Sequence, residues 1–301
     1  MIGPVVDTPE NRGMRKAVAF MAIVAAAMPS VWAGERGPGL KVVASFYPLY
    51  IATLNVACGV PGVDVANMTP SFAGCLHDYS LTPDDRATLA GADVFVVNGA
   101  GMENFLDKAV RQAPRMKVIT SSDGVDFIRR DGEPNPHIWL SVTRHIRQVR
   151  NIADGLAKAD PPHAEAYRRN ADAYAVKLRK MKEEIEAGLK DVPLRDIVTF
   201  HEAFPYFAEE FGLRVAAVIE RDPGDDPSAR EMAETIGVVR RLGIKAIFTE
   251  PQYPAKAAET IARETGARVC LLDPAVTGPA DRDAFLDIMR RNLATLRKAL
   301  K

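Results

Sequence analysis

Residues 161–191 read PPHAEAYRRNADAYAVKLRKMKEEIEAGLKD, and this stretch sets the architecture of the chain. Its apolar residues recur at helical spacing among many charged side chains, which predicts one continuous helix. A helix of about 30 residues would be roughly 45 Å long. Asp160, Pro161 and Pro162 separate it from another helical stretch at about 143–158. We therefore expect a single long helix to link two flanking parts of the chain.

Upstream of this helix, short β-branched runs alternate with helical patterns. The runs at 40–49, 92–101 and 116–120 are bounded by Gly, Pro or polar residues, as strands are. Residues 82–91 and 102–113 have helical spacing. This order predicts a repeated βα unit.

The sequence Thr82-Pro83-Asp84-Asp85 predicts the start of a helix. Threonine is a good N-cap, proline suits the first helical position, and acidic residues favour the first turn. His77 therefore lies in the loop that leads into this helix.

Downstream of the long helix the alternation resumes. Strands are predicted at 195–200, 214–220, 244–250 and 267–273, with helical patterns at 203–212, 228–243 and 254–266. Alternating strands and helices favour parallel sheets with helices on both faces. We predict an α/β protein with two α/β lobes, parallel sheets, one long joining helix and a metal site in the cleft.

The first residues are predicted to be an export signal. Arg15–Lys16 form a basic region, Ala17–Met28 an apolar region, and Val31–Ala33 resembles a small-residue cleavage site. The apolar region is shorter than the roughly 20 residues that a membrane span needs. We expect a signal peptide at 1–33, cleaved after about Ala33, and a soluble periplasmic protein, with Met14 as an alternative start.

The remaining chain is divided into an N-terminal lobe at 34–160, a linking helix at 161–190 and a C-terminal lobe at 191–301. The full 301-residue sequence has 47% hydrophobic residues, enough for a substantial core. Its 39 basic residues balance 39 acidic ones without long runs of either sign, so we expect no nucleic-acid partner.

Four side chains follow strands or extended runs and could share one site: His77, His137, His201 and Asp273. In parallel sheets, ligands gather at the carboxyl ends of the strands. Three imidazoles and a carboxylate suit zinc, manganese or iron. Their wide spacing matches no short metal motif, so the alternative that each histidine only caps a loop stays open.

The other histidines and the cysteines are given structural roles. His145 and His163 fall on charged helical surface, and we expect them to be solvated. Cys58 and Cys75 could pair in an oxidising compartment, or stay as two thiols. Cys75 could also coordinate zinc, although pairing or simple burial is preferred. Cys270 lies in an apolar run and is expected to be a small buried hydrophobe.

Five segments carry a family resemblance: VVASFYPLYIATLNVA, HDYSLTPDDRATLAGADVFVVNGAGMENFL, PHIWLS, HEAFPYFAEEFGL and IFTEPQYPAKAAETIARETGARVCLLDP. In this order, from about Lys41 to the C-terminus, they resemble the solute-binding proteins of ABC importers for zinc and manganese. The resemblance implies that His77, His137 and His201 are three metal ligands and that Asp273 is the carboxylate ligand.

The resemblance also implies the function. The chain is expected to be a monomeric, non-enzymatic receptor that delivers a divalent metal to an ABC permease and its ATPase. Zinc is favoured because His201 stands where manganese receptors of this family carry glutamate. The segment 127–139 lacks the histidine-rich loop of many zinc receptors, so a manganese or iron receptor is the alternative.

Neighbouring residues are expected to support the ligands. Glu202, Asp78 and Glu250 could accept an imidazole N–H or serve structural roles. Aromatic residues are expected to pack around the site, namely Tyr47, Tyr50, Trp139, Phe204 and Phe207. A zinc hydrolase with Glu202 as general base is a second alternative, which Asp273 disfavours by filling the open coordination position. A metal with a purely structural role is a third.

Overall fold

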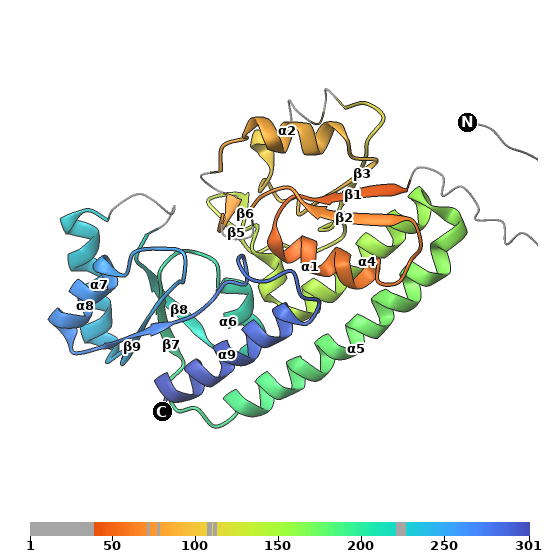
Figure 1. The fold of residues 1–301 in the computed structure, drawn as a ribbon. Helices are drawn as coiled ribbons and strands as arrows, with labels where there is room; N and C mark the ends of the chain where they lie inside the picture. The colour runs from red at the N-terminus through yellow and green to blue at the C-terminus, as the bar shows by residue number, and fades with distance from the viewer. Residues whose placement is uncertain (1–38, 71–72, 77–78, 107–109, 111–112, 221–226) are drawn as a thin grey trace, which may run out of the picture. The chain divides into compact units, whose positions relative to one another are not determined.

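Two four-stranded parallel sheets are present in the computed structural model, which describes residues 39–70, 73–76, 79–106, 110, 113–220 and 227–301 (Figure 1). The first sheet has the strand order β2-β1-β3-β4. Its strands are β1 (Leu40–Ala44), β2 (Val63–Asn67), β3 (Val94–Val97) and β4 (Lys117–Thr120). All four residues of β3 are buried, as expected for a central parallel strand covered on both faces.

The second sheet has the order β10-β9-β7-β8. Its strands are β7 (Asp196–Thr199), β8 (Arg214–Val218), β9 (Ala246–Thr249) and β10 (Arg268–Leu271). The pairs β7·β8, β7·β9 and β9·β10 are all parallel. The carboxyl ends of β7, β9 and β10 therefore lie next to one another at one edge of the sheet.

Helices connect and cover these strands. They are α1 (Tyr47–Val56), α2 (Pro83–Ala90), α4 (Val142–Ala159), α5 (Ala164–Leu189), α6 (Pro205–Phe211), α7 (Ala229–Leu242), α8 (Lys256–Thr265) and α9 (Ala284–Ala299). Short 3₁₀ turns occur at η2 (Asn104–Leu106), η3 (Ile138–Leu140) and η4 (Pro161–His163). A two-stranded antiparallel ribbon pairs β5 (Arg129–Arg130) with β6 (Glu133–Pro134).

The long helix α5 has 26 residues, which gives it a length of roughly 39 Å. Its buried side chains recur at helical spacing, namely Tyr167, Ala171, Tyr174, Ala175, Leu178, Met181, Ile185 and Leu189. This apolar stripe packs against α4 and α1 on the N-terminal side and against α9 from the end of the chain (Figure 1). The predicted fold class, two α/β lobes with parallel sheets joined by one long helix, is confirmed.

Local signals account for several element boundaries. At the start of α2, Thr82 and Asp85 form a reciprocal capping box, so the predicted helix start is confirmed. Ser228 and Glu231 do the same for α7. Strand β2 was not predicted, because its residues are only half-buried at the sheet edge. Of the helix predicted at 102–113, the described part holds the short turn η2.

His145 corrects a prediction. It is fully buried, whereas the charged sequence around it indicated a solvated position. Its helix α4 turns this face toward the interior, and the ring of His145 contacts Phe285 at 4.6 Å and Tyr174 at 6.3 Å between centroids. Burial lowers the pKa of His145 to about 4, so its imidazole is neutral at neutral pH.

Residues 37–301 form one compact unit, and the lobe boundaries at 160 and 190 stay predictions. The predicted signal peptide at 1–33 lies outside the described residues. In the part of the chain that is described, no helix has both the length and the apolar character needed to cross a bilayer.

Candidate metal centre

His201, Glu250 and Asp273 follow β7, β9 and β10, three neighbouring strands of the second sheet. The parallel order brings these residues to the same edge, as predicted from their positions after strands. His201 is completely buried and Glu250 is 2% exposed. The carboxyl edge of this sheet is thus a buried, polar surface.

His137 comes to this surface from the part of the chain that precedes the long helix. It directly precedes the turn η3 and is 2% exposed. Its Nε2 lies 3.1 Å from Nε2 of His201, and the two ring centroids are 4.9 Å apart. Two of the predicted ligands, which are distant in the sequence, therefore lie side by side.

The opposite nitrogen of each ring is held by an oxygen. Nδ1 of His137 lies 2.9 Å from Oδ1 of Asn135, and Nδ1 of His201 lies 2.5 Å from Oε1 of Glu250. Both oxygens are acceptors, so they favour the tautomer in which Nδ1 carries the proton. The lone pair of each Nε2 is then directed toward the other ring. Two such lone pairs at this distance repel each other unless they share a proton or a metal ion.

Cys75 is the third donor of the group. Its side chain is buried, and its Sγ lies 3.7 Å from Nε2 of His201. One ligand atom from each of Cys75, His137 and His201 lies within 4.8 Å of the other two. Two imidazoles and a thiol at such distances are a donor set suited to zinc.

The sequence left open whether Cys58 and Cys75 form a disulfide or stay as two thiols. The two residues are not joined, and Sγ of Cys58 instead contacts the guanidinium of Arg282. Sγ of Cys75 lies in the group with His137 and His201. The alternative of two separate thiols is the one that the structure has.

Of the two remaining predicted ligands, the structure describes only Asp273. His77 lies outside the described residues, as does Asp78. Asp273 is described, and its Oδ1 accepts a hydrogen bond from the backbone N–H of Ala275 at 2.8 Å. Burial raises the pKa of Asp273, and the nearby charge of Glu250 raises it further. Asp273 does not belong to the group of three donors that lie within 4.8 Å of one another.

The two supporting carboxylates that the structure describes, Glu250 and Glu202, are not equivalent. Glu250 orients His201, and its other oxygen accepts a hydrogen bond from the Gln252 side chain at 2.9 Å. Glu202 instead accepts from Arg130 at 2.7 Å, in a pair that is partly exposed to solvent. Glu202 is thus engaged in an ion pair, which leaves the hydrolase alternative without a general base directed at the metal group.

Asn135 was not among the site residues predicted from the sequence. Its Oδ1 accepts hydrogen bonds from both the backbone N–H and Nδ1 of His137, each at 2.9 Å. A side-chain bond to the backbone two residues later is an Asx turn, and Asn followed by Pro is a known signal for one. The Asn135-Pro136-His137 segment therefore contained a readable indication of how His137 is fixed.

Aromatic side chains enclose the group. Trp139 is buried, its ring centroid lies 5.3 Å from that of His137, and its Nε1 donates to the carbonyl of Pro274 at 2.8 Å. Tyr253 lies 5.8 Å from His201 and stacks on Phe200. Of the aromatic residues predicted to pack here, Tyr47, Trp139, Phe204 and Phe207 are buried and Tyr50 is partly buried.

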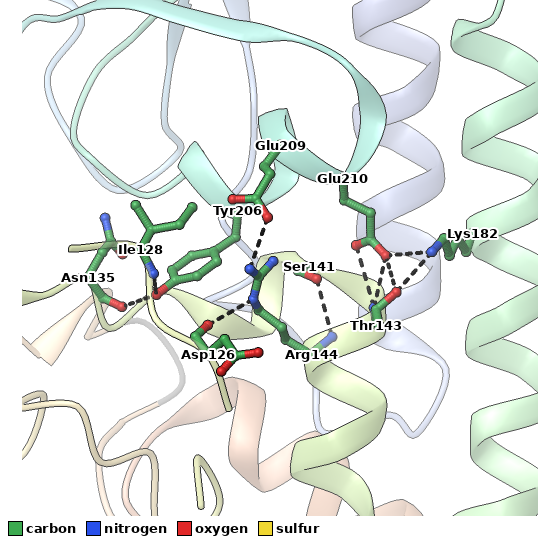
Figure 2. A network of polar contacts seen from close by, with 10 residues as sticks. All are labelled: Asp126, Ile128, Asn135, Ser141, Thr143, Arg144, Lys182, Tyr206, Glu209 and Glu210. Atoms are coloured by element: carbon green, nitrogen blue, oxygen red, sulfur yellow. Dashed lines mark hydrogen bonds and ion pairs between the residues drawn. The ribbon is translucent and has the colours of Figure 1, made fainter. Parts of the chain in front are cut away.

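Helix α6 secures the loop that carries Asn135 (Figure 2). The hydroxyl of Tyr206 donates to the Asn135 carbonyl at 2.7 Å and accepts from the backbone N–H of Ile128 at 3.0 Å. Arg144 lies over the Tyr206 ring at 4.7 Å and pairs with Glu209 at 3.0 Å. The residue that orients His137 is therefore held by the same helix that follows His201.

A second set of contacts in Figure 2 joins α6 to α4 and α5. Glu210 accepts from the backbone N–H of Thr143 at 3.1 Å and pairs with Lys182 at 2.9 Å. Burial alone would raise the pKa of Glu210, but the hydrogen bonds from Thr143 and Lys182 outweigh it, so this pKa is lowered. The carboxylate is thus held in its charged form at the junction of three helices.

Comparison with known proteins shows the family of this chain. The family described as zinc-uptake complex component A, periplasmic (ZnuA) matches residues 42–299. The chain belongs to this family. The resemblance inferred from the sequence motifs is confirmed, and a component of an uptake complex is a transport protein, so the hydrolase alternative is excluded.

Individual relatives extend the comparison. The high-affinity zinc uptake system protein ZnuA of Bacillus subtilis is 29% identical over 290 residues, which cover 89% of this chain and 90% of the relative. The zinc-binding protein AdcA of Streptococcus pyogenes is 31% identical and matches 86% of this chain but 55% of its own length, so the chain spans about half of AdcA. The solute-binding protein FpvC of Pseudomonas aeruginosa, solved in complex with Mn²⁺, superposes with a TM-score of 0.79 at 32% identity, over 87% of this chain and 98% of FpvC.

Proposed function

We propose that this chain is the periplasmic receptor of a zinc importer, which binds Zn²⁺ and delivers it to the permease of an ABC transporter driven by its ATPase. The membership in the zinc-uptake family supports the transport role. The donor group supports the choice of a transition metal, because buried imidazole nitrogens and a thiol are poor ligands for magnesium or calcium.

One observation carries the proposal: Nε2 of His137 and Nε2 of His201 face each other at 3.1 Å while both Nδ1 atoms are held by acceptors. At Zn–N distances of about 2.0–2.1 Å and a tetrahedral angle, two ligand nitrogens lie about 3.4 Å apart. The observed separation is near this value. A zinc ion therefore fits between the rings with little movement of either.

His77 and Asp273 complete the proposed ligand set. His77 would reach the ion from the loop before α2, and Asp273 lies at the same sheet edge as His201 and Glu250. A carboxylate beside the imidazoles would offset part of the charge of a divalent cation. We propose that the ion bridges the two lobes and that the permease releases it by drawing the ligands apart.

The location and assembly are part of the same proposal. The chain would be exported, cleaved after Ala33 and active as a monomer in the periplasm. The test therefore begins with protein expressed with its own leader and recovered from the periplasm of a Gram-negative host. Mass spectrometry of the recovered protein identifies its N-terminus, and light scattering measures its oligomeric state.

The central experiment is calorimetric titration of the metal-stripped protein with Zn²⁺ and with Mn²⁺. We expect one tight zinc site, weaker manganese binding, and loss of the site in His137→Ala and His201→Ala. His163→Ala is the matched control, because His163 is half-exposed and its Nδ1 is bound to Asp160 at 2.8 Å. Absence of stoichiometric binding of either metal to the wild-type protein would overturn the proposal.

A manganese or iron receptor of the same type is the second candidate. It is favoured by the similarity to FpvC, whose structure was solved in complex with Mn²⁺. Tighter binding of Mn²⁺ than of Zn²⁺ in the same titration would keep the receptor and change its cargo.

A further inference from the structure

The metal group contains a donor that the family resemblance does not carry to this chain. We propose that the thiolate of Cys75 is a direct ligand of the bound metal and makes the receptor select zinc over manganese. This inference rests on the proposed function, since it concerns the same ion. It adds a sulfur donor to a site that the resemblance describes with imidazoles and a carboxylate alone. Because tetrahedral zinc takes four ligands, Cys75 would take the corner otherwise filled by Asp273, which does not belong to the close group of donors.

The distances fit coordination. With a Zn–S distance of about 2.3 Å and Zn–N distances of about 2.0–2.1 Å, a tetrahedral angle places sulfur and nitrogen about 3.6 Å apart. Sγ of Cys75 lies 3.7 Å from Nε2 of His201. The ligand atoms of Cys75, His137 and His201 all lie within 4.8 Å of one another, so the three occupy three corners of one coordination polyhedron.

The backbone before Cys75 is shaped to hold this position. Gly74 has a φ of +78°, in the left-handed region, and a Cβ atom there would lie 3.4 Å from Cγ of Gln252. Gln252 in turn donates to Glu250, which orients His201. The segment of Cys75 thus packs on the same residues that fix one of the histidine ligands.

The burial of the next residue supports the same conclusion. Leu76 is fully buried in the main hydrophobic core, which anchors the chain immediately after Cys75. Cys75 itself is 5% exposed, so its thiol is shielded from competing reactions at the surface. Packing as a small hydrophobe does not require the sulfur to lie among two imidazole nitrogens, whereas metal coordination does.

The chemistry explains the selectivity. On metal binding the S–H bond of Cys75 breaks, the proton passes to water and the sulfur lone pair forms the S–metal bond. No oxidation or reduction takes part. Thiolate is a soft ligand that suits zinc, whereas manganese prefers oxygen ligands. A sulfur corner therefore strengthens zinc binding and leaves manganese binding almost unchanged.

X-ray absorption of the wild-type protein loaded with one equivalent of Zn²⁺ tests the inference without a mutation. We expect a sulfur shell at about 2.3 Å in addition to nitrogen and oxygen at about 2.0–2.1 Å. In the Co²⁺-loaded protein we expect a near-ultraviolet thiolate-to-cobalt charge-transfer band. A zinc spectrum with nitrogen and oxygen neighbours only, or a cobalt complex without the band, would overturn it.

Variants then link the ligand to selectivity. Cys75→Ser is expected to lose the cobalt band and to weaken zinc binding by roughly 10–100-fold or more, since even outer contacts of a metal site cost that much. Manganese affinity should stay close to that of wild type. Cys270→Ser is the matched control, because Cys270 is a half-buried cysteine in β10, and it should keep the band and the affinity.

The outcomes separate the two proposals. If zinc still requires His137 and His201 but Cys75→Ser binds as the wild type does, the receptor stands and the thiolate ligand fails. If the wild-type protein binds neither Zn²⁺ nor Co²⁺, the proposed function itself fails. Circular dichroism melting of metal-free Cys75→Ser checks its folding, and a folding defect leaves the absorption spectrum of the wild type as the deciding result.

Discussion

Oε1 of Glu250 lies 2.5 Å from Nδ1 of His201, and each side chain is only 1% exposed. A carboxylate that accepts from a ligand imidazole fixes its tautomer and orientation and raises its basicity. The same oxygen also accepts from the backbone N–H of His201 at 3.4 Å. Glu250 thus determines how His201 presents Nε2 to the metal group.

Replacing this carboxylate should weaken metal binding without removing a ligand. We expect Glu250→Gln to lower zinc affinity by about tenfold, at the low end of the roughly 10–100-fold cost of such supporting contacts. The neutral amide keeps the shape but loses the charge that polarises the imidazole. Calorimetric titration gives the affinity, and Glu202→Gln, which alters the surface pair with Arg130, should bind zinc as the wild type does.

The sheet architecture and the proximity of His137 to His201 could be predicted from the sequence, because both depend on local patterns. β-Branched runs became β1, β3, β4 and the strands of the second sheet, and the charged helical stretch became α5. His137 and His201 follow extended segments, and parallel topology then brings strand ends together. Position after a strand is a property that a sequence can show.

Two features depend on tertiary packing: the burial of His145, which was predicted to be solvated, and the position of Cys75, for which zinc coordination was ranked below pairing and burial. His145 lies among charged residues in sequence, yet it shares a helical face with Val142 and Val149, and that face is buried. Cys75 has no periodic pattern around it, and its direction follows from the left-handed backbone at Gly74 and contact with a loop far along the chain. No spacing rule could have placed its sulfur beside His201.

Removal of the hydroxyl group should change the free energy of unfolding differently at two buried tyrosines. The Tyr206 hydroxyl makes two hydrogen bonds to backbone groups, whereas the buried Tyr174 hydroxyl has no hydrogen-bond partner among the described residues. We expect Tyr206→Phe to lower the free energy of unfolding by about 1–3 kcal/mol and Tyr174→Phe to leave it unchanged or slightly higher. Urea unfolding of the metal-free proteins measures both. Equal losses in the two variants would contradict the assignment.

Glu103 should make the protein less stable as the pH rises. It is buried and accepts hydrogen bonds from Ser45 and from the N–H groups of Asn98 and Gly99, yet burial outweighs these bonds and raises its pKa to about 7. The folded state therefore holds this proton more tightly than the unfolded chain does. Between about pH 4.5 and pH 7 the unfolded state loses its proton first, so ionisation costs the fold up to about 3 kcal/mol.

The contribution of Glu103 is measured as the difference between the wild type and Glu103→Gln in the free energy of unfolding as a function of pH. The free energy of unfolding of the wild type, minus that of Glu103→Gln, should decrease as the pH is raised through this window. Substitution also replaces the oxygen that faces Gly99, which shifts the variant by a constant amount and leaves the slope to be compared. Parallel profiles would show that Glu103 does not titrate in the range given.

His145 should make the protein less stable as the pH falls, which is opposite to the effect of Glu103. Its pKa is lowered to about 4 by burial, so the unfolded chain takes up a proton before the folded state does as the pH falls. Between about pH 6.5 and pH 4 this costs the fold up to roughly 3 kcal/mol, and the stabilisation is fully present above that range. Relative to His145→Leu, the wild type should lose stability on acidification in urea unfolding at several pH values. A constant difference between the two proteins would contradict a buried neutral histidine.

Zinc itself should stabilise the folded protein, because an ion at the proposed site would be bound by donors that come before and after α5 in the sequence. At a free concentration about 1,000 times the dissociation constant, a ligand that binds only the folded state adds about 4 kcal/mol. For a chain of this size that corresponds to a rise in melting temperature on the order of 10 °C. The shift should shrink as the pH falls from about 7.5 to about 5, because protons compete with the metal for imidazole nitrogen and for the thiol.

Thermal melts with and without zinc distinguish this linkage from non-specific ion effects. His201→Ala should melt at the same temperature in both conditions, since it lacks the Nε2 that lies 3.1 Å from Nε2 of His137 and 3.7 Å from Sγ of Cys75. His163→Ala should keep the full zinc shift, and Ca²⁺ should produce none in either protein because it prefers oxygen ligands. An equal zinc shift in His201→Ala would mean that the ion acts at another place on the molecule, and the group of Cys75, His137 and His201 would then not be the receptor site.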